Sequence, residues 1–485
     1  MAERKLQQEN NQEQPKELKR TLKAKHLNMI AIGGAIGTGL FLASGLTVNQ
    51  AGPGGALLAY AVIGVMVYFL MTSLGEMATF MPVSGSFQTY ASRFVDPAFG
   101  FALGWNYWYN WAITVAAEMV AGALIMKYWF PNVPSIIWSV IFLVLIFGLN
   151  MLSAKAYGES EYWFAGAKVI TVLVFLVVGL LMIFGIMGGH KTGLSNFTYK
   201  GGPFPHGMSA ILLVFLTAGF SFQGTELVGI AAGESENPEK NVPKAINTVF
   251  WRILIFYIGA LFVIGAIIPY TDAGNGISPF TLVFERAGIA GAASIMNAVV
   301  LSSVLSCGNS GMYASSRMLY AMAMEGKAPT WLGKVNGRGV PINALLLTTV
   351  VASACFLSGL YAENTVYAWL VAASGLTGFI AWVGIAISHY RFRKAYVAQG
   401  YDLKDLKYRA KLFPIGPIIA LVLCVVVIFG QGAGYVTGPK IDWVGLITTY
   451  FGLPIFAIIW GVYKYKHKTK IVALKEADFS RDNVN

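Results

Sequence analysis

Long apolar runs separated by short polar segments dominate this chain of 485 residues. A membrane-spanning helix needs about 20 mostly apolar residues. Runs of that kind lie at about 28–47, 54–75, 98–127, 134–153, 163–186, 207–231, 247–268, 288–322, 342–362, 366–389, 413–431 and 442–463. The pattern predicts an all-α polytopic membrane protein with twelve transmembrane helices. These helices form one domain at 28–463, with a polar tail at 1–27 before it and a second tail at 464–485 after it.

The basic residues are distributed unevenly between the two sides of this arrangement. The chain has 35 Lys and Arg against 23 Asp and Glu, a formal net charge of +12. Most of the basic residues fall in the tails and in the loops on the same side, whereas the opposite side keeps Lys127, Lys191, Lys200, Arg286 and Lys440. Cytoplasmic loops are enriched in Lys and Arg, so we expect both termini in the cytoplasm, a multi-pass location in the cell membrane, and a lipid bilayer rather than nucleic acid as the partner of this charge.

Composition, cysteine positions and the first residues narrow the class of protein further. Only 12% of the residues are charged, about half the usual fraction in soluble domains, which excludes an ordinary soluble enzyme. The cysteines Cys307, Cys355 and Cys424 lie in apolar runs, so no disulfide framework is expected. The polar first 27 residues contain no apolar stretch with a cleavage site, so no removable signal peptide is expected either.

Two spans are interrupted by glycine at matching places. Residues 33–39 read Gly-Gly-Ala-Ile-Gly-Thr-Gly, and residues 219–226 read Gly-Phe-Ser-Phe-Gln-Gly-Thr-Glu. A helix-packing face is one interpretation. The other is a pair of discontinuous helices from a five-plus-five inverted repeat, about 28–186 and 207–389, with the last two helices (413–463) outside it. The backbone N–H groups at such a break would suit a substrate carboxylate.

Three ionisable residues lie clearly within spans, away from their ends: Glu118, Lys168 and Glu226. Each costs about 2.5–3.5 kcal/mol or more at mid-membrane, so each needs a partner or a function. Lys168 and Glu226 are expected at similar depth, where they would form a structural pair or couple transport to protons. Nearby, Tyr107 and Trp111 are four residues apart on one helix face, where aromatic rings either line a pocket that accepts a cation or pack in the core.

Two other classes of membrane protein are disfavoured. The segment Gly308-Asn309-Ser310-Gly311 fits the GxSG pattern of intramembrane serine proteases, but that chemistry needs a histidine base within hydrogen-bond reach. The five histidines fall in tails, loops or at a helix end, so we expect no enzyme. A channel would show symmetric charge rings or a filter sequence, and this sequence has an asymmetric two-half design instead.

Several motifs resemble the bacterial amino-acid permeases of the amino acid–polyamine–organocation superfamily. They are Gly-Gly-Ala-Ile-Gly-Thr-Gly-Leu-Phe (33–41), Ser-Leu-Gly-Glu-Met-Ala (73–78), Pro-Val-Ser-Gly-Ser-Phe (82–87), Gly-Phe-Ser-Phe-Gln-Gly-Thr-Glu-Leu-Val-Gly (219–229) and Gly-Glu-Ser-Glu-Asn-Pro (233–238). The segments at 99–111, 308–315 and 387–393 are most similar to the lysine-specific permeases of that superfamily. The resemblance implies the twelve-helix fold with the inverted repeat, and import of a basic amino acid with a proton by alternating access.

The resemblance also assigns roles to single residues. Thr38 and Gly39 would offer N–H groups to the substrate carboxylate, and the carbonyl groups of Ala35, Ile36 and Gln223 would accept its ammonium. Phe220 would be an aromatic gate. Lys168 falls where proton-coupled members carry a lysine in place of sodium, and Glu226 is the acid beside the pocket.

The substrate itself stays open between basic amino acids. A cationic side chain in a pocket of low dielectric needs an anion, and the candidates are Glu226 first, then Glu118 and Asp272. Lysine permeases carry an Asn-Thr pair where this chain has Ala372-Ala373, so histidine remains close behind lysine, with arginine third. A transporter-fold sensor that signals through a partner is the alternative from another class. No metal, ATP or redox cofactor site is expected, and the oligomeric state is left open.

Overall fold

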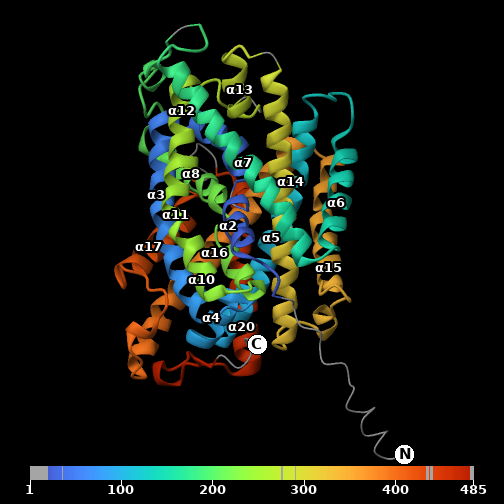
Figure 1. Cartoon of the computed structure of the whole chain (residues 1–485), viewed down its shortest axis with the longest axis vertical. Helices are drawn as coiled ribbons and strands as arrows, with labels where there is room; N and C mark the ends of the chain where they lie inside the picture. The colour runs from blue at the N-terminus through green and yellow to red at the C-terminus, as the bar shows by residue number, and fades with distance from the viewer. Residues whose placement is uncertain are drawn as a thin grey trace, which may run out of the picture.

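The computed structural model describes residues 20–34, 36–189, 191–274, 277–289, 291–432, 436 and 441–480. Over these residues the regular elements are helices, and one isolated parallel bridge joins Leu22 to Ser235. In Figure 1 the long helices run along the long axis of the molecule.

Nine helices of the described part are long and apolar enough to cross a membrane, and two shorter apolar helices lie at Ser135–Asn150 and Ile415–Gly430. One of the nine, Gly39–Phe80, contains 42 residues, about twice what a single crossing needs. It kinks at Gly52, whose φ of 76° lies in the left-handed region, so it makes two crossings. Twelve crossings result, and the prediction of an all-α polytopic fold with twelve spans is confirmed.

The helical elements of the described part are, in chain order, α2 (Ala24–Gly33), η1 (Gly39–Ala43), α3 (Ser44–Phe80), α4 (Ser86–Phe94), α5 (Pro97–Met126), α6 (Ser135–Asn150), α7 (Ala154–Ile183), η2 (Ser195–Phe197), α8 (Gly207–Phe222), α9 (Leu227–Ala231), η3 (Ala232–Glu234), α10 (Pro238–Asn247), α11 (Val249–Arg252), η4 (Ile253–Gly259), α12 (Ala260–Ile267), α13 (Pro279–Arg286), α14 (Ala292–Met324), η5 (Thr330–Gly333), α15 (Ile342–Ala352), η6 (Ser353–Gly359), α16 (Glu363–Ala398), η7 (Leu403–Asp405), α17 (Ile415–Gly430), α19 (Trp443–Tyr450), α20 (Gly452–His467) and η8 (Leu474–Glu476). Below, the crossings are also numbered 1 to 12 in chain order.

Helices 1 and 6 are both discontinuous, as the glycine pattern predicts. Helix 1 consists of α2 and, after an unwound stretch up to Thr38, of η1 continuing into α3. Helix 6 consists of α8 and α9, separated by residues 223–226. Gly224 adopts a φ of 98°, a conformation that costs a residue with a Cβ about 1–2 kcal/mol. Glycine is therefore needed at this turn.

Helix 5 begins earlier than its hydropathy predicts. The apolar run starts at about residue 163, but α7 begins at Ala154, where the Ser153 side chain accepts a hydrogen bond from the Ala156 N–H. Hydropathy marks the apolar part of a helix, whereas a cap residue sets its true start. Lys168 therefore lies much farther from the start of its helix than the apolar run predicts, and Glu161 belongs to the same helix.

Both ends of the described chain lie at one end of the bundle. We call the end that carries α4 and α10 the inner end and the end that carries α13 the outer end (Figure 1). At the inner end the Leu22 N–H donates to the Glu234 carbonyl at 2.9 Å, and the Val472 N–H donates to the Val95 carbonyl at 2.9 Å. An even number of crossings is consistent with this arrangement.

Helix α5 lies at the centre of the bundle. It packs against α4, α6, α14, α16 and α20. Of the 18-residue apolar stretches in the nine spans, that of α5 is also the most buried, with 89% of it inside the structure. Residues that point from α5 toward helices 1, 6 and 10 are therefore shielded from lipid, and the candidate site is built there.

Candidate functional site

A wide cavity of about 1440 Å³ enters the bundle from the outer end. Its walls come from helices 1, 3, 6 and 10 and from the segment before α13. Leu42 and Ala43 of helix 1 and Leu216 and Thr217 of helix 6 line it, and these residues lie within about one helical turn of Gly39 and Phe220. The cavity therefore leads from the outer end toward the two helix breaks.

The two breaks face each other at close range. A Cβ on Gly34 would lie 2.5 Å from Leu227 Cδ1 and 3.4 Å from the Gly224 carbonyl oxygen. A Cβ on Gly39 would lie 2.3 Å from the Cα of Ser221. Glycine at these positions lets the backbones of helices 1 and 6 touch on both sides of the unwound stretch. The first N–H groups of a helical segment have no partner within it, so polar backbone groups are concentrated at this point.

Glu118 of α5 points at the break in helix 1. Its Oε1 accepts a hydrogen bond of 2.9 Å from the Thr38 hydroxyl. Its Oε2 is buried and has no hydrogen-bond partner among the described residues. Tyr367 of α16 lines the outer cavity. A carboxylate oxygen with unused acceptor capacity is thus held beside the unwound segment.

Lys168 of α7 caps the carbonyl end of α2. Its Nζ donates to the Gly33 carbonyl at 2.5 Å, and it lies 3.8 Å from Glu161 Oε1 in the same helix. Both side chains are fully buried. The Ser306 hydroxyl also contacts both oxygens of Glu161, at 2.7 and 2.8 Å. The structural Lys–Glu pair considered from the sequence therefore exists, but its acid is Glu161 and not Glu226.

Glu226 lies at the break in helix 6 and is turned toward helices 3 and 10. Its carboxylate accepts hydrogen bonds from the Gly224 N–H at 3.1 Å, from the Tyr107 hydroxyl at 3.2 Å and from the Trp382 indole N–H at 3.4 Å. Glu226 is 1% exposed, and no Lys or Arg of the described part lies within 4.0 Å of its carboxylate. Its two oxygens are held by neutral donors.

The two aromatic candidates on α5 are buried beside this acid. Tyr107 and Trp111 are at most 1% exposed, and their rings meet edge to face at 6.3 Å. The ring of Phe87 packs against Tyr107 at 4.5 Å. The Trp111 indole N–H is buried and unpartnered among the described residues.

The remaining candidates occupy different surroundings. Phe220 is 5% exposed at the end of α8, and the Gln223 amide donates to the Gly375 carbonyl at 3.3 Å. Ile36 is buried, whereas Ala35 lies outside the described residues. Asp272 lies near the outer end, where it is half exposed and pairs with Arg286 at 2.9 Å. The structure thus gathers the candidates of helices 1, 3, 5 and 6 around the breaks and places Asp272 apart from them.

On the inner side of the breaks a buried polar cluster joins helices 5, 6 and 8. Glu234 accepts hydrogen bonds from the Tyr313 hydroxyl at 2.6 Å and from Arg317 Nε at 3.1 Å. Tyr157 of α7 stacks on Tyr313 at 4.1 Å between ring centroids. Glu234, Tyr313 and Arg317 are each at most 1% exposed. The cluster, together with the Leu22–Ser235 bridge, fastens the inner end, while the opposite end holds the cavity.

Comparison with known proteins agrees with this arrangement. The profile of the amino acid permease family matches residues 26–476. The chain belongs to the amino acid permease family. It is 56% identical over 475 residues to the lysine-specific permease LysP of Escherichia coli (strain K12), covering 96% of this chain and 97% of that protein. The lysine-specific permease LysP of Lactococcus lactis subsp. cremoris (strain MG1363) is 56% identical over 493 residues, covering 99% and 96%. The histidine permease HisP of the same strain is 50% identical over 478 residues, covering 97% and 100%.

Membership of the amino acid permease family implies an amino acid as the substrate and a multi-pass membrane protein as the structure that carries the cavity. The relatives are named as permeases and not as enzymes. The serine of the GxSG pattern, Ser310, accepts a hydrogen bond of 3.0 Å from the Tyr157 hydroxyl, within the packing of helices 5 and 8. Two histidines that the sequence places in a tail and at a helix end, His26 and His389, lie within α2 and α16 and are fully buried.

Hydropathy and spacing miss several buried charged residues of the permease, among them Glu161, Glu234 and Arg252. Glu161 and Glu234 lie outside the predicted apolar runs, and Arg252, near the start of the run at 247–268, counts among the basic residues of the inner side. Averaged hydropathy predicts that a charged residue with polar neighbours lies in a solvent-exposed loop. The sequence nevertheless contains an indication of the pair between Glu161 and Lys168. The two residues are seven positions apart, a spacing that places both on one face of a helix.

Proposed function

We propose that this permease imports a basic amino acid, with L-lysine as the preferred substrate, by proton symport and alternating access. The observation that carries the proposal is the cavity from the outer end, which leads toward two facing helix breaks. Buried acids and a buried lysine surround these breaks. With the inner end fastened, this arrangement is that of an outward-facing transporter. In the cell the inner end faces the cytoplasm, as the basic tails and loops favour.

The substrate carboxylate binds at the start of the outer half of helix 1. The N–H groups of Thr38 and Gly39 begin this segment, where the positive end of the helix dipole attracts an anion. The substrate ammonium binds carbonyl groups at the two breaks, including that of Ile36 in helix 1 and that of Gln223 in helix 6. Phe220 lies in the last turn of α8, about one helical turn from the cavity-lining Leu216, and closes over the bound molecule.

Glu118 supplies the negative charge for a cationic substrate. Of the acids near the breaks, Glu226 has both oxygens engaged by N–H and O–H donors, and Glu161 is paired with Lys168. Glu118 retains a free oxygen among the described residues. A buried carboxylate oxygen without a donor is costly, so Glu118 favours a bound cation over an empty site.

Glu226 and Lys168 couple transport to protons. Lys168 holds the carbonyl end of α2 where a bound cation would otherwise stabilise it. Glu226 links the break in helix 6 to Tyr107 on α5 and Trp382 on α16. A proton gained or lost at Glu226 changes the bonds that hold these three helices together, which ties protonation to their relative movement.

The test is uptake of labelled lysine into proteoliposomes under an inward proton gradient without sodium, with unlabelled histidine and arginine as competitors. Glu226→Gln abolishes gradient-driven uptake while the protein still elutes as a single species. Unchanged uptake in this variant removes Glu226 from the coupling role. Absence of gradient-driven flux in the parent protein refutes the symport proposal. Binding of lysine without flux favours the sensor alternative.

Histidine is the second candidate substrate, and one observation supports keeping it. Ala372, one of the two residues that depart from the lysine-permease pattern, lines the outer cavity. A small apolar residue there leaves room for an imidazole ring. Potent competition by histidine, reduced in an Ala372→Asn/Ala373→Thr variant, would assign histidine as the substrate.

A further inference from the structure

Arg252 is a buried guanidinium that the proposed transport mechanism does not use. It ends α11 at the start of the π-helical segment η4 in helix 7 and is 7% exposed. No Asp or Glu of the described part lies within 4.0 Å of its nitrogens. Its hydrogen bonds go instead to two backbone carbonyl groups, those of Ala31 and Ala245, the second at 3.4 Å.

Both carbonyl groups belong to the last turn of a helix. Ala31 lies in the last turn of α2, the inner half of helix 1, and Ala245 lies in the last turn of α10. The last carbonyl groups of a helix have no partner within it and carry the negative end of the helix dipole. The Thr248 hydroxyl also donates to the Ala245 carbonyl, at 2.8 Å. The bond that links two crossings is therefore the one from Arg252 in helix 7 to Ala31 in helix 1. Helix α2 has no basic residue of its own in its last turn, so this charge comes from outside.

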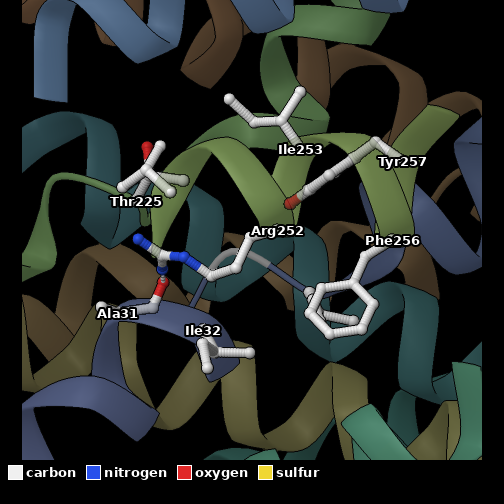
Figure 2. A pocket seen from close by; sticks show the side chains of 9 residues that line it. Ala31, Ile32, Thr225, Arg252, Ile253, Phe256 and Tyr257 are labelled. Atoms are coloured by element: carbon white, nitrogen blue, oxygen red, sulfur yellow. Dashed lines mark hydrogen bonds between the residues drawn. The ribbon is translucent and has the colours of Figure 1, made fainter. Parts of the chain in front are cut away.

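Figure 2 shows how Arg252 reaches α2. The guanidinium extends from helix 7 to the Ala31 carbonyl, with Ile32 and Thr225 nearby. A void of about 10 Å³, room for about one water molecule, lies among these side chains. The Arg252 Nε has no hydrogen-bond partner in the described part of the chain. The contact with α2 therefore rests on the Ala31 carbonyl alone, without a carboxylate that would fix the charge in place.

The two cations at the end of α2 differ in this respect. Lys168 bonds the Gly33 carbonyl and is also paired with Glu161 of its own helix. Its charge is therefore still balanced when α2 moves away. Arg252 loses its acceptor on α2 and finds no acid of the described part within reach. Movement of α2 away from helix 7 is therefore opposed by Arg252, in addition to the backbone bonds of Leu22 with Glu234 and Glu236.

We propose that Arg252 is a positioning residue that latches the inner half of helix 1 in the outward-facing arrangement. Its release from Ala31 accompanies opening of the inner end. The proposal rests on the proposed alternating-access function, because it assigns one step of that cycle to a particular bond. It predicts that loss of the guanidinium shifts the population toward arrangements in which α2 has moved.

Cys307 provides a native reporter of that movement. Its thiol is buried behind the unwound segment and contacts the Gly34 carbonyl at 3.6 Å. In a background with Cys355→Ala and Cys424→Ala, Cys307 is the remaining thiol. A membrane-impermeant maleimide added at the inner face reaches it only when α2 is displaced.

The experiment compares Arg252→Met with Arg252→Lys in this background, in membrane vesicles of both orientations. Loss of a charge-assisted bond raises the modification rate about tenfold or more in Arg252→Met. Arg252→Lys, which keeps the charge but bonds fewer carbonyl groups, gives a smaller rise. Both increases occur with reagent at the inner face only. Where Arg252→Met does not fold, Arg252→Lys carries the test alone.

The matched control is Arg286→Met. Arg286 also bonds the last carbonyl group of a helix, Ile267 of α12 at 2.9 Å, but at the outer end. Its substitution leaves the Cys307 rate unchanged. A parental rate in the Arg252 variants, or an equal rise from both faces, overturns the latch. This readout needs no transport, so a parent protein without uptake refutes the proposed function while the labelling still decides the role of Arg252.

Discussion

The ion pair between Lys168 and Glu161 allows a quantitative test of how helix 1 is held. The two charges are 3.8 Å apart and fully buried, and Lys168 also bonds the Gly33 carbonyl. A Cβ on Gly33 would lie 2.3 Å from Glu161 Oε1, so the carboxylate and the end of α2 are in direct contact. Removing either charge leaves the other buried without its partner.

The expected energies follow from the geometry. Two unit charges about 4 Å apart attract by about 4 kcal/mol at an effective dielectric constant of about 20. Breaking a buried pair by removing one partner costs about 3–5 kcal/mol. Lys168→Met and Glu161→Gln should each reduce the free energy of unfolding by that amount. The double variant contains no unpaired charge, so it should lose clearly less than the sum of the two single variants.

The assay is a double-mutant cycle on the purified permease, with the free energy of unfolding obtained from denaturant titrations in mixed micelles. Lys155→Met, which removes a lysine that is exposed at the start of α7, is the matched control and should change stability by less than about 0.5 kcal/mol. Strictly additive losses from the two single variants would refute a coupled pair. In transport, Lys168→Ala should slow uptake more than it weakens equilibrium binding, and an equal fall in both would make Lys168 purely structural.

Two further predictions concern the contact between helices 1 and 6 and the inner end. Gly39→Ala should destabilise the protein by about 1–3 kcal/mol, because its methyl group would collide with the backbone of Ser221. Gly166→Ala, whose Cβ would meet open space, should be neutral or slightly stabilising. Burial raises the pKa of Asp96, but bonds from Lys464 and two other donors outweigh it and hold the pKa below its ordinary value. Asp96→Asn should therefore cost about 1 kcal/mol at pH 7, with the loss reduced for a partly exposed lysine.

The outcomes that would contradict these two predictions are distinct. Equal melting temperatures for Gly39→Ala and Gly166→Ala would mean that helices 1 and 6 do not touch at this point. For Asp96, the stabilisation is complete above about pH 4, the pKa in the unfolded chain, and is lost as the pH falls through the lower folded value. The difference between parent and Asp96→Asn should therefore shrink between pH 7 and pH 3, and a constant difference would rule out the ionised carboxylate as its source.

Much of the architecture follows from local properties of the sequence. The twelve spans can be read from hydropathy, because lipid requires about 20 apolar residues for each crossing. The breaks in helices 1 and 6 can be read from glycine density, because glycine weakens a helix wherever it stands. The positions of Glu118, Lys168 and Glu226 within spans are equally visible, because a charge in an apolar run is rare.

The partners of these charges were decided by the tertiary structure alone. Lys168 pairs with Glu161 because α7 begins at a serine cap, ahead of its apolar run, and carries both residues to the same buried face. Glu118 meets Thr38 because α5 passes the unwound part of helix 1. Arg252 lies near the start of the apolar run at 247–268, yet it is buried because its guanidinium reaches the carbonyl groups of Ala31 and Ala245. Hydropathy and spacing act along one chain segment, whereas a buried charge is satisfied by groups that only folding brings within hydrogen-bond distance.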